Sequence, residues 1–285
     1  MLRSDIPVTS IKALQERYDG ILFDAYGVLL QEHGAAPHAV DLIARLRSEH
    51  YPFAIVSNSA SRSVENAARF YASHGLAIDP GCIVLSGASL RPYFEEHDLK
   101  GSRCVVLGGH DARHWVRTAG GVPIEAASHD SMDVLVVAEV EDGLTLAHLE
   151  TVLSRVCSAI DEHRDIHLVA PNPDLYYPKG GAALGFAAGS IADCIERVLQ
   201  ARYGNEHAPR FVRLGKPNPP MFVEACKRLG SRRVVMVGDQ IDTDIAGAQA
   251  AGLDSALVTF GLTAEARRNA QNDFCKPTYL LETFA

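Results

Sequence analysis

The chain has 285 residues, 47% of them hydrophobic, and a formal net charge of −8 at pH 7, which is typical of a globular protein of about two domains. Its acidic and basic residues are interspersed, its N-terminus lacks an apolar signal core, and its longest apolar stretch is too short for a membrane span. These features, with six scattered cysteines and no Cys-x-x-Cys pair, predict a cytoplasmic protein with reduced thiols that binds neither nucleic acid nor membrane.

The first hundred residues alternate between two kinds of hydrophobic pattern. Short apolar runs predict buried strands, and apolar residues at helical spacing predict amphipathic helices. The expected strands cover residues 21–23, 53–57 and 83–85, and the expected helices cover residues 11–17, 40–49, 64–73 and 88–96. This βαβαβ order predicts an α/β fold with a doubly wound, Rossmann-like parallel sheet.

A second alternation begins near residue 101, and the first pattern returns near residue 211. The expected strands of the second alternation cover residues 104–107, 134–138 and 166–170, and its helices lie around Trp115 and over 146–160 and 189–200. After the return, a helix over 220–229, a strand over 234–237, a helix over 246–251 and a strand over 256–259 are expected. A segment as long as residues 101–210 is far longer than an ordinary connection between neighbouring strands. We therefore interpret residues 101–210 as an α/β domain inserted into a core made of residues 1–100 and 211–285.

Several predicted strands end in polar side chains. Asp24 follows the first, Ser57 ends the second, and Gly238 closes the 234–237 strand before Asp239, Asp242 and Asp244. Taken singly, each has a plainer explanation as a turn or helix-capping residue. Together they would lie along the carboxyl edge of a parallel sheet, where ligands bind in open α/β folds.

Carboxylates gathered at that edge require a cation. Asp24 and Asp239 at a separation of ~4 Å would repel by ~4 kcal/mol at an effective dielectric of ~20. An all-oxygen ligand set suits Mg²⁺, and Lys216 can supply a second positive charge. The arrangement predicts a carboxylate nucleophile beside a metal and a phosphate clamp.

Four ordered segments resemble the motifs of the haloacid dehalogenase (HAD) superfamily. They are Phe23-Asp24-Ala25-Tyr26-Gly27-Val28, Val56-Ser57-Asn58-Ser59, Gly215-Lys216-Pro217 and Gly238-Asp239-Gln240-Ile241-Asp242-Thr243-Asp244. The insertion, with Asn172-Pro173-Asp174 and the glycine-rich stretch after it, resembles the class IIA cap. That cap occurs in the branch containing nitrophenyl-phosphate, nucleotide and sugar phosphate phosphatases, and it allows a homodimer formed through the cap.

The resemblance implies a role for each matching residue. Asp24 would be the nucleophile that accepts the phosphoryl group as an aspartyl-phosphate, and Lys216 would hold the nucleophile and phosphate charges together. Ser57 and Asn58 would bind the phosphoryl oxygens. The implied Mg²⁺ site consists of Asp24, the backbone carbonyl of Tyr26, Asp239 and, in support, Asp244.

One position departs from the phosphatase pattern. That pattern is Asp-x-Asp, whose second aspartate protonates the leaving group and then activates water, but this chain has Tyr26 there. Asp-x-Tyr-Gly instead resembles the hydrolytic 2-haloacid dehalogenases, which lack both the metal and the acidic pattern present at 238–244. We favour a Mg²⁺-dependent phosphohydrolase of a small phosphorylated metabolite with altered acid–base chemistry. The alternatives are a metal-independent hydrolase of the 2-haloacid dehalogenase type and a binding protein with this fold and negligible turnover.

Overall fold

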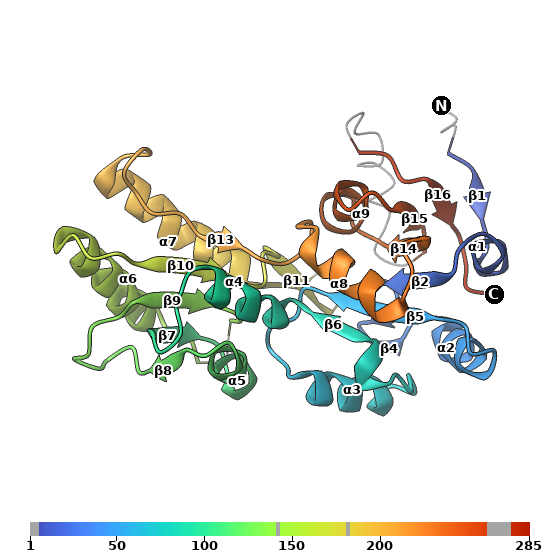
Figure 1. Ribbon diagram of the computed structural model, residues 1–285, viewed down its shortest axis with the longest axis horizontal. Helices are drawn as coiled ribbons and strands as arrows, with labels where there is room; N and C mark the ends of the chain where they lie inside the picture. The colour runs from blue at the N-terminus through green and yellow to red at the C-terminus, as the bar shows by residue number, and fades with distance from the viewer. Residues whose placement is uncertain (1–5, 141–142, 181–182, 261–274) are drawn as a thin grey trace. The chain divides into compact units, whose positions relative to one another are not determined.

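The computed structural model describes residues 6–140, 143–180, 183–260 and 275–285 (Figure 1). The chain divides into two compact units. The first unit comprises Met1–Ser57, Val64–Leu85 and Lys216–Ala285, and the second unit comprises Asn58–Ser63 and Ser86–Gly215. No helix within the described ranges is long and apolar enough to cross a membrane.

The first unit is built on a seven-stranded sheet in which each pair of neighbouring strands is parallel. In spatial order the strands are β1 (Val8–Thr9), β16 (Tyr279–Leu281), β15 (Asp254–Val258), β14 (Val234–Gly238), β2 (Gly20–Phe23), β5 (Phe53–Ser57) and β6 (Ile83–Leu85). Every residue of β2 and β14 is buried, as expected for central strands covered on both faces. The predicted α/β class with a parallel sheet is confirmed.

Helices connect these strands and bury their apolar sides. They are α1 (Ile11–Arg17), α2 (Ala39–Ser48), α3 (Val64–Ser73), α8 (Pro220–Leu229) and α9 (Ala246–Ala250), and a short hairpin of β3 (Leu30–Gln31) and β4 (Gly34–Ala35) follows β2. Local signals fix several ends: Ser10 caps α1 by accepting from the Ala13 amide, and Gly230 closes α8 in a left-handed conformation. Phe222 of α8 packs with Leu22 and Met236 on one face of the sheet.

The order of the strands reverses at the centre of this sheet. From β2 the chain proceeds outward to β5 and β6, whereas from β14 it proceeds to β15 and β16 on the other side. The carboxyl ends of β2 and β14 therefore flank a topological switch point, the place where open α/β sheets form their ligand crevice.

The second unit has its own five-stranded parallel sheet. Its strands, in spatial order, are β13 (Val212–Arg213), β10 (His167–Ala170), β9 (Val134–Val137), β7 (Arg103–Leu107) and β8 (Val122–Ile124). Its helices are α4 (Leu90–Glu96), α5 (His110–Thr118), α6 (Leu146–Asp161) and α7 (Ala188–Tyr203), and β11 (Tyr176–Gly180) pairs with β12 (Ala183–Phe186) as an antiparallel ribbon.

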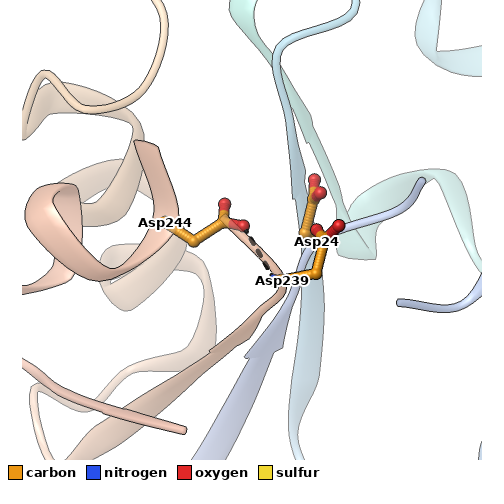
Figure 2. Close-up of side chains that lie close together, drawn as sticks. All are labelled: Asp24, Asp239 and Asp244. Carbon is orange, nitrogen blue, oxygen red and sulfur yellow. Dashed lines mark hydrogen bonds between the residues drawn. The ribbon is translucent and has the colours of Figure 1, made fainter. Parts of the chain in front are cut away.

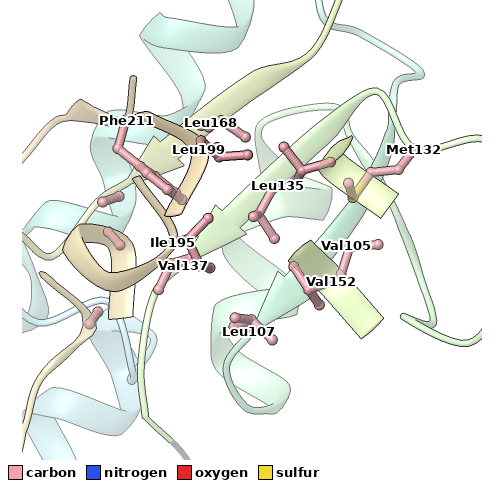
Figure 3. Packing of buried hydrophobic residues seen from close by; sticks show 14 of the residues in the cluster. Val105, Leu107, Met132, Leu135, Val137, Val152, Leu168, Ile195, Leu199 and Phe211 are labelled. Carbon is pink, nitrogen blue, oxygen red and sulfur yellow. The ribbon is translucent and has the colours of Figure 1, made fainter. Parts of the chain in front are cut away.

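Two hydrophobic clusters cover the two faces of that sheet. Figure 3 shows the first, in which Leu135 and Val137 of β9 pack with Val152 of α6 and with Ile195 and Leu199 of α7. The second cluster brings α4 and α5 against the opposite face. The second unit thus encloses a core of its own.

The division of the chain differs from the predicted domain limits at 100/101 and 210/211. Leu90, Tyr93 and Phe94 of α4 pack against the second sheet, which brings residues 86–100 into the second unit. Phe211 also lies in the core of that unit, and β13 pairs with β10. A sequence pattern shows that a helix is amphipathic, but it does not show which core receives the apolar side. That the second unit serves as a class IIA cap stays a prediction.

Candidate active site

Asp24 and Asp239 lie at the carboxyl ends of two adjacent strands. The register of β2 and β14 pairs Phe23 with Val237, and the Asp24 amide donates to the Val237 carbonyl at 2.9 Å. Asp239 follows directly on Gly238, the last residue of β14. Both side chains are buried, with exposed fractions of 6% and 8%. The switch point therefore carries two buried carboxylates (Figure 2).

A short π-helical turn, Ile241–Ile245, follows β14 and brings Asp244 back to the same place. Its Oδ2 accepts from the backbone amides of Asp239 and Gln240, each at 3.2 Å, and the residue is fully buried. Gly238 permits this return, because a Cβ there would lie 2.3 Å from the Asp244 Cβ. Asp242, on the same turn, is exposed and stands outside the cluster.

Lys216 lies between two of these carboxylates. Its Nζ donates to Asp24 Oδ1 at 2.7 Å and to Asp244 Oδ1 at 2.6 Å, and the residue is 2% exposed. Charge-assisted hydrogen bonds of this length are strong ones. If all three carboxylates were ionised, one ammonium would leave two negative charges uncompensated in a buried site. A divalent cation would balance them.

The pKa values of Asp24 and Asp239 reflect first their burial and then the neighbouring carboxylates. Burial raises the pKa of Asp24 to about 7, with Asp244 adding to the rise and Lys216 opposing it. Burial, followed by the charges of Asp24 and Asp244, raises the pKa of Asp239 well above its ordinary value. Burial alone would lower the pKa of Lys216, but the two neighbouring carboxylates hold it above its ordinary value. The lysine is therefore a permanent cation that does not fully compensate the carboxylates.

The arrangement fits a metal ion bound by oxygen. Asp24, Asp239 and Asp244 can each offer an oxygen within 4.8 Å of the others. Asp239 Oδ1 is buried and has no hydrogen-bond partner among the residues that the structure describes. An unpartnered buried carboxylate oxygen calls for an explanation such as a bound ion, and an oxygen-only set suits Mg²⁺.

Gly27 brings the backbone of the first motif against Asp239. Its φ is +91°, and a Cβ at this position would lie 2.2 Å from Asp239 Oδ2. The chain that follows Tyr26 therefore passes directly beside the carboxylate, a course compatible with a metal ligand from the Tyr26 backbone. The side chain of Tyr26 is 41% exposed.

The remaining predicted site residues occur where the chain passes from one unit to the other. Ser57 ends β5, the neighbour of β2 in the sheet, and so lies at the same carboxyl edge as Asp24. Asn58 belongs to the second unit, where its Nδ2 donates to Asp174 Oδ1 at 2.8 Å. The sequence singled out Asp174 only as part of the Asn-Pro-Asp segment and gave no indication of this partner.

Comparison with known families and proteins gives a consistent result. Residues 21–121 match the family model described as haloacid dehalogenase-like hydrolase, and residues 213–285 match a second model described as HAD-hydrolase-like. A dihydroxyacetone phosphatase from Corynebacterium glutamicum is 26% identical over 268 residues, which cover 93% of this chain and 88% of that protein. A D-glycerol 3-phosphate phosphatase from Mycobacterium tuberculosis is 27% identical over 270 residues, covering 95% and 71% of the two chains.

Solved structures agree with these matches. A structure from Cytophaga hutchinsonii, described as a possible sugar phosphatase of the HAD superfamily, matches with a TM-score of 0.85 and 29% identity, covering 98% of both chains. A glycerol phosphate phosphatase from Mycobacterium tuberculosis in complex with magnesium matches with a TM-score of 0.76 and 25% identity, covering 94% of this chain and 76% of that one. Since two models of one superfamily together match more than half of the chain, and a solved structure of that superfamily matches nearly all of it, this chain belongs to the haloacid dehalogenase-like hydrolases.

Proposed function

We propose that this protein is a Mg²⁺-dependent phosphohydrolase that cleaves a small phosphorylated metabolite through an aspartyl-phosphate on Asp24. The buried cluster of Asp24, Lys216, Asp239 and Asp244 at the switch point of the sheet carries the proposal. The names of the relatives support it, because they describe phosphatases of small phosphorylated compounds.

In the first proposed step, a carboxylate oxygen of Asp24 attacks the phosphorus of the substrate. The bond from phosphorus to the leaving-group oxygen breaks, and that oxygen departs with the bonding electrons and takes up a proton. In the second step, water attacks the phosphorus of the aspartyl-phosphate and loses a proton. Inorganic phosphate is released and the Asp24 carboxylate is restored.

Each of the other proposed residues has a part in holding charge. Lys216 would keep the nucleophile ionised and offset the charge of the incoming phosphoryl group, since it donates to Asp24 while staying protonated. Ser57, with Asn58 beside it, would bind the phosphoryl oxygens at the end of β5.

Asp24, Asp239 and the Tyr26 backbone carbonyl would hold the metal, with Asp244 supporting the site through its bonds to Lys216 and to the Asp239 amide. Bound there, Mg²⁺ would supply charge stabilisation to the phosphoryl oxygens. Its charge would also oppose the rise in the pKa values of Asp24 and Asp239, which burial causes first and the neighbouring carboxylates second.

Phosphate release from a panel of phosphorylated metabolites, measured with Mg²⁺ and with EDTA, tests this function. We expect turnover that EDTA abolishes and that Asp24→Asn eliminates. The proposal would be wrong if phosphate were released from none of the substrates on the panel.

Tyr26 favours a second candidate, a metal-independent hydrolase of the 2-haloacid dehalogenase type. Release of halide from 2-haloacids that survives EDTA would establish that reading instead. Tight binding of a phosphorylated compound without turnover would point to a binding protein. The homodimer through the cap stays a prediction, which the mass of the protein in solution would test.

A further inference from the structure

The chain passes between the two units four times, and two of these passages occur beside proposed site residues. One joins Ser57 to Asn58, and the other joins Gly215 to Lys216. Ser57 and Lys216 belong to the first unit, whereas Asn58 and Gly215 belong to the second. A contact that holds Asn58 in place therefore also restrains Ser57 through one peptide bond. A contact that holds Gly215 in place restrains Lys216 in the same way, and both restrained residues are proposed to bind the phosphoryl group.

Within the second unit, Asn58 is held by Asp174. The Asn58 side chain is buried, with the residue 4% exposed, and its Nδ2 donates to Asp174 Oδ1 at 2.8 Å. The other end of the amide faces Gly215, since a Cβ on that glycine would lie 2.6 Å from Asn58 Oδ1. The hydrogen bond to the Asp174 carboxylate, which only accepts, identifies the nitrogen end of the amide, so the side chain has one orientation rather than two.

The backbone of Asp174 is held in place by two hydrogen bonds of its own. Its backbone amide donates to Asn172 Oδ1 at 2.9 Å, the short-range turn that asparagine side chains favour. Its carbonyl accepts from the Gly189 amide at 2.9 Å, where α7 begins. Gly189 allows this contact, because a Cβ there would lie 2.2 Å from the Pro173 carbonyl oxygen. The carboxylate therefore projects from a backbone anchored on both sides.

The same loop also packs against Gly215. A Cβ on Gly215 would lie 2.6 Å from Pro173 Cδ and 2.8 Å from the Pro171 carbonyl oxygen. The loop of residues 171–174 thus lies against both Asn58 and Gly215 within the second unit.

We propose that Asp174 is a positioning residue for the phosphoryl site. By holding the Asn58 amide, it fixes the Ser57-Asn58 peptide at the end of β5 and so sets the place of the Ser57 hydroxyl. In this role the Asn58 side chain acts as a link to Asp174. The inference rests on the proposed function, because it assigns Ser57 and its neighbour to phosphoryl binding.

Inorganic phosphate, the product of the proposed reaction, is the probe for this inference. Its inhibition constant is to be measured for the wild type, Asp174→Ala, Asp174→Asn, Asn58→Ala and the double variant Asn58→Ala/Asp174→Ala, together with kcat and KM. We expect Asp174→Ala to raise the inhibition constant and KM about tenfold, on the scale of one charge-assisted hydrogen bond. Asp174→Asn keeps an oxygen that can accept from Asn58 and should recover most of the loss.

The double variant separates positioning from general stability. If Asp174 acts through Asn58, adding Asp174→Ala to Asn58→Ala should change the inhibition constant far less than it does in the wild type. Asp133→Ala is the matched control, since the Asp133 carboxylate also accepts a hydrogen bond within the second unit, in its case from the Arg103 backbone amide at 2.8 Å. It should lower the melting temperature without changing phosphate inhibition.

Two results would overturn the inference. One is an unchanged inhibition constant in Asp174→Ala, and the other is full additivity of the two substitutions. In either case wild-type phosphatase activity would leave the proposed function intact. A wild type that neither hydrolyses phosphate esters nor is inhibited by phosphate would overturn the function and this inference together.

Discussion

At the scale of single residues, Tyr26 in place of the second aspartate predicts that the rate of hydrolysis depends unusually strongly on the leaving group. General acid–base assistance typically contributes ~10²–10⁴-fold to a rate, and a phenol hydroxyl is a poor base for activating water near neutrality. If no other group supplies the proton, aryl and acyl phosphates, whose leaving groups depart unprotonated, should be cleaved far faster than alkyl phosphates. Rates for a series of substituted phenyl phosphates and simple alkyl phosphates measure this dependence.

Tyr26→Asp provides the matching substitution. Since the Tyr26 side chain is 41% exposed, the smaller aspartate should leave no buried cavity. We expect it to raise alkyl phosphate turnover while leaving aryl phosphate turnover nearly constant. A wild-type rate that is flat across the series would show that another group donates the proton.

Asp239 carries a separate prediction about the metal. Asp239→Asn removes one negative charge from the buried cluster but keeps a side chain of the same size. Mg²⁺ affinity should fall by about tenfold or more, the change typical of losing a charged ligand interaction, and excess Mg²⁺ should restore part of the rate. Titration of activity against Mg²⁺ measures the shift. An unchanged Mg²⁺ requirement would remove Asp239 from the metal site.

At the scale of the element, the turn after β2 depends on Gly27. Its φ of +91° and its close approach to Asp239 Oδ2 leave no room for a side chain. Gly27→Ala should therefore both destabilise the fold by ~1–2 kcal/mol and displace the carboxylate, with loss of Mg²⁺ binding and activity. Denaturant unfolding and Mg²⁺ titration report the two effects separately.

Gly252→Ala is the control for that substitution. Gly252 has a similar positive φ of +71°, but a Cβ there would meet nothing within 4 Å. It should share the backbone destabilisation and retain Mg²⁺ binding. Equal loss of Mg²⁺ binding in both variants would mean that strain anywhere in the first unit disables the site.

At the scale of the whole molecule, stability without Mg²⁺ should fall as the pH rises. The pKa of Asp24 is raised to about 7, whereas a free aspartate titrates near pH ~4. Between these values the folded state holds a proton that the unfolded state has released, so stability present below pH ~4 is lost as the pH rises through about 7. The raised pKa of Asp239 acts in the same direction. Lys216, whose pKa is also raised, adds a loss of stability in the same direction, but only above pH ~10, where a free lysine titrates.

Mg²⁺ should reverse this loss, because it binds the ionised carboxylates of the folded state. Melting temperatures measured near pH ~5 and ~8, with and without Mg²⁺, should show a larger stabilisation by the metal at the higher pH. Asp239→Asn should reduce that difference. If Mg²⁺ raised the melting temperature by the same amount at both pH values, a metal site built on Asp24 and Asp239 would be contradicted.

Much of the fold could be predicted because its signals are local. The apolar runs at 21–23 and 234–237 are the central strands β2 and β14, and the helical pattern of residues 220–229 is α8. The strands β8, β13 and β16 were not predicted, because β8 contains a proline, β13 has only two residues, and β16 pairs with β1 at the other end of the chain.

The sequence by itself determined the superfamily, the α/β class and the identity of the acidic residues, since motif order and hydrophobic period are properties of the chain alone. The resemblance already chose Asp244 over Asp242 for the metal site, but only the tertiary structure showed that Asp244 is held there by its bonds to Lys216 and the Asp239 amide, while Asp242 stays exposed. Which of two nearby carboxylates turns inward depends on the phase of one helical turn against the sheet. Only the structure, likewise, assigned α4 to the second unit and paired Asn58 with Asp174. Both outcomes are contacts between distant segments, and packing in three dimensions selects them.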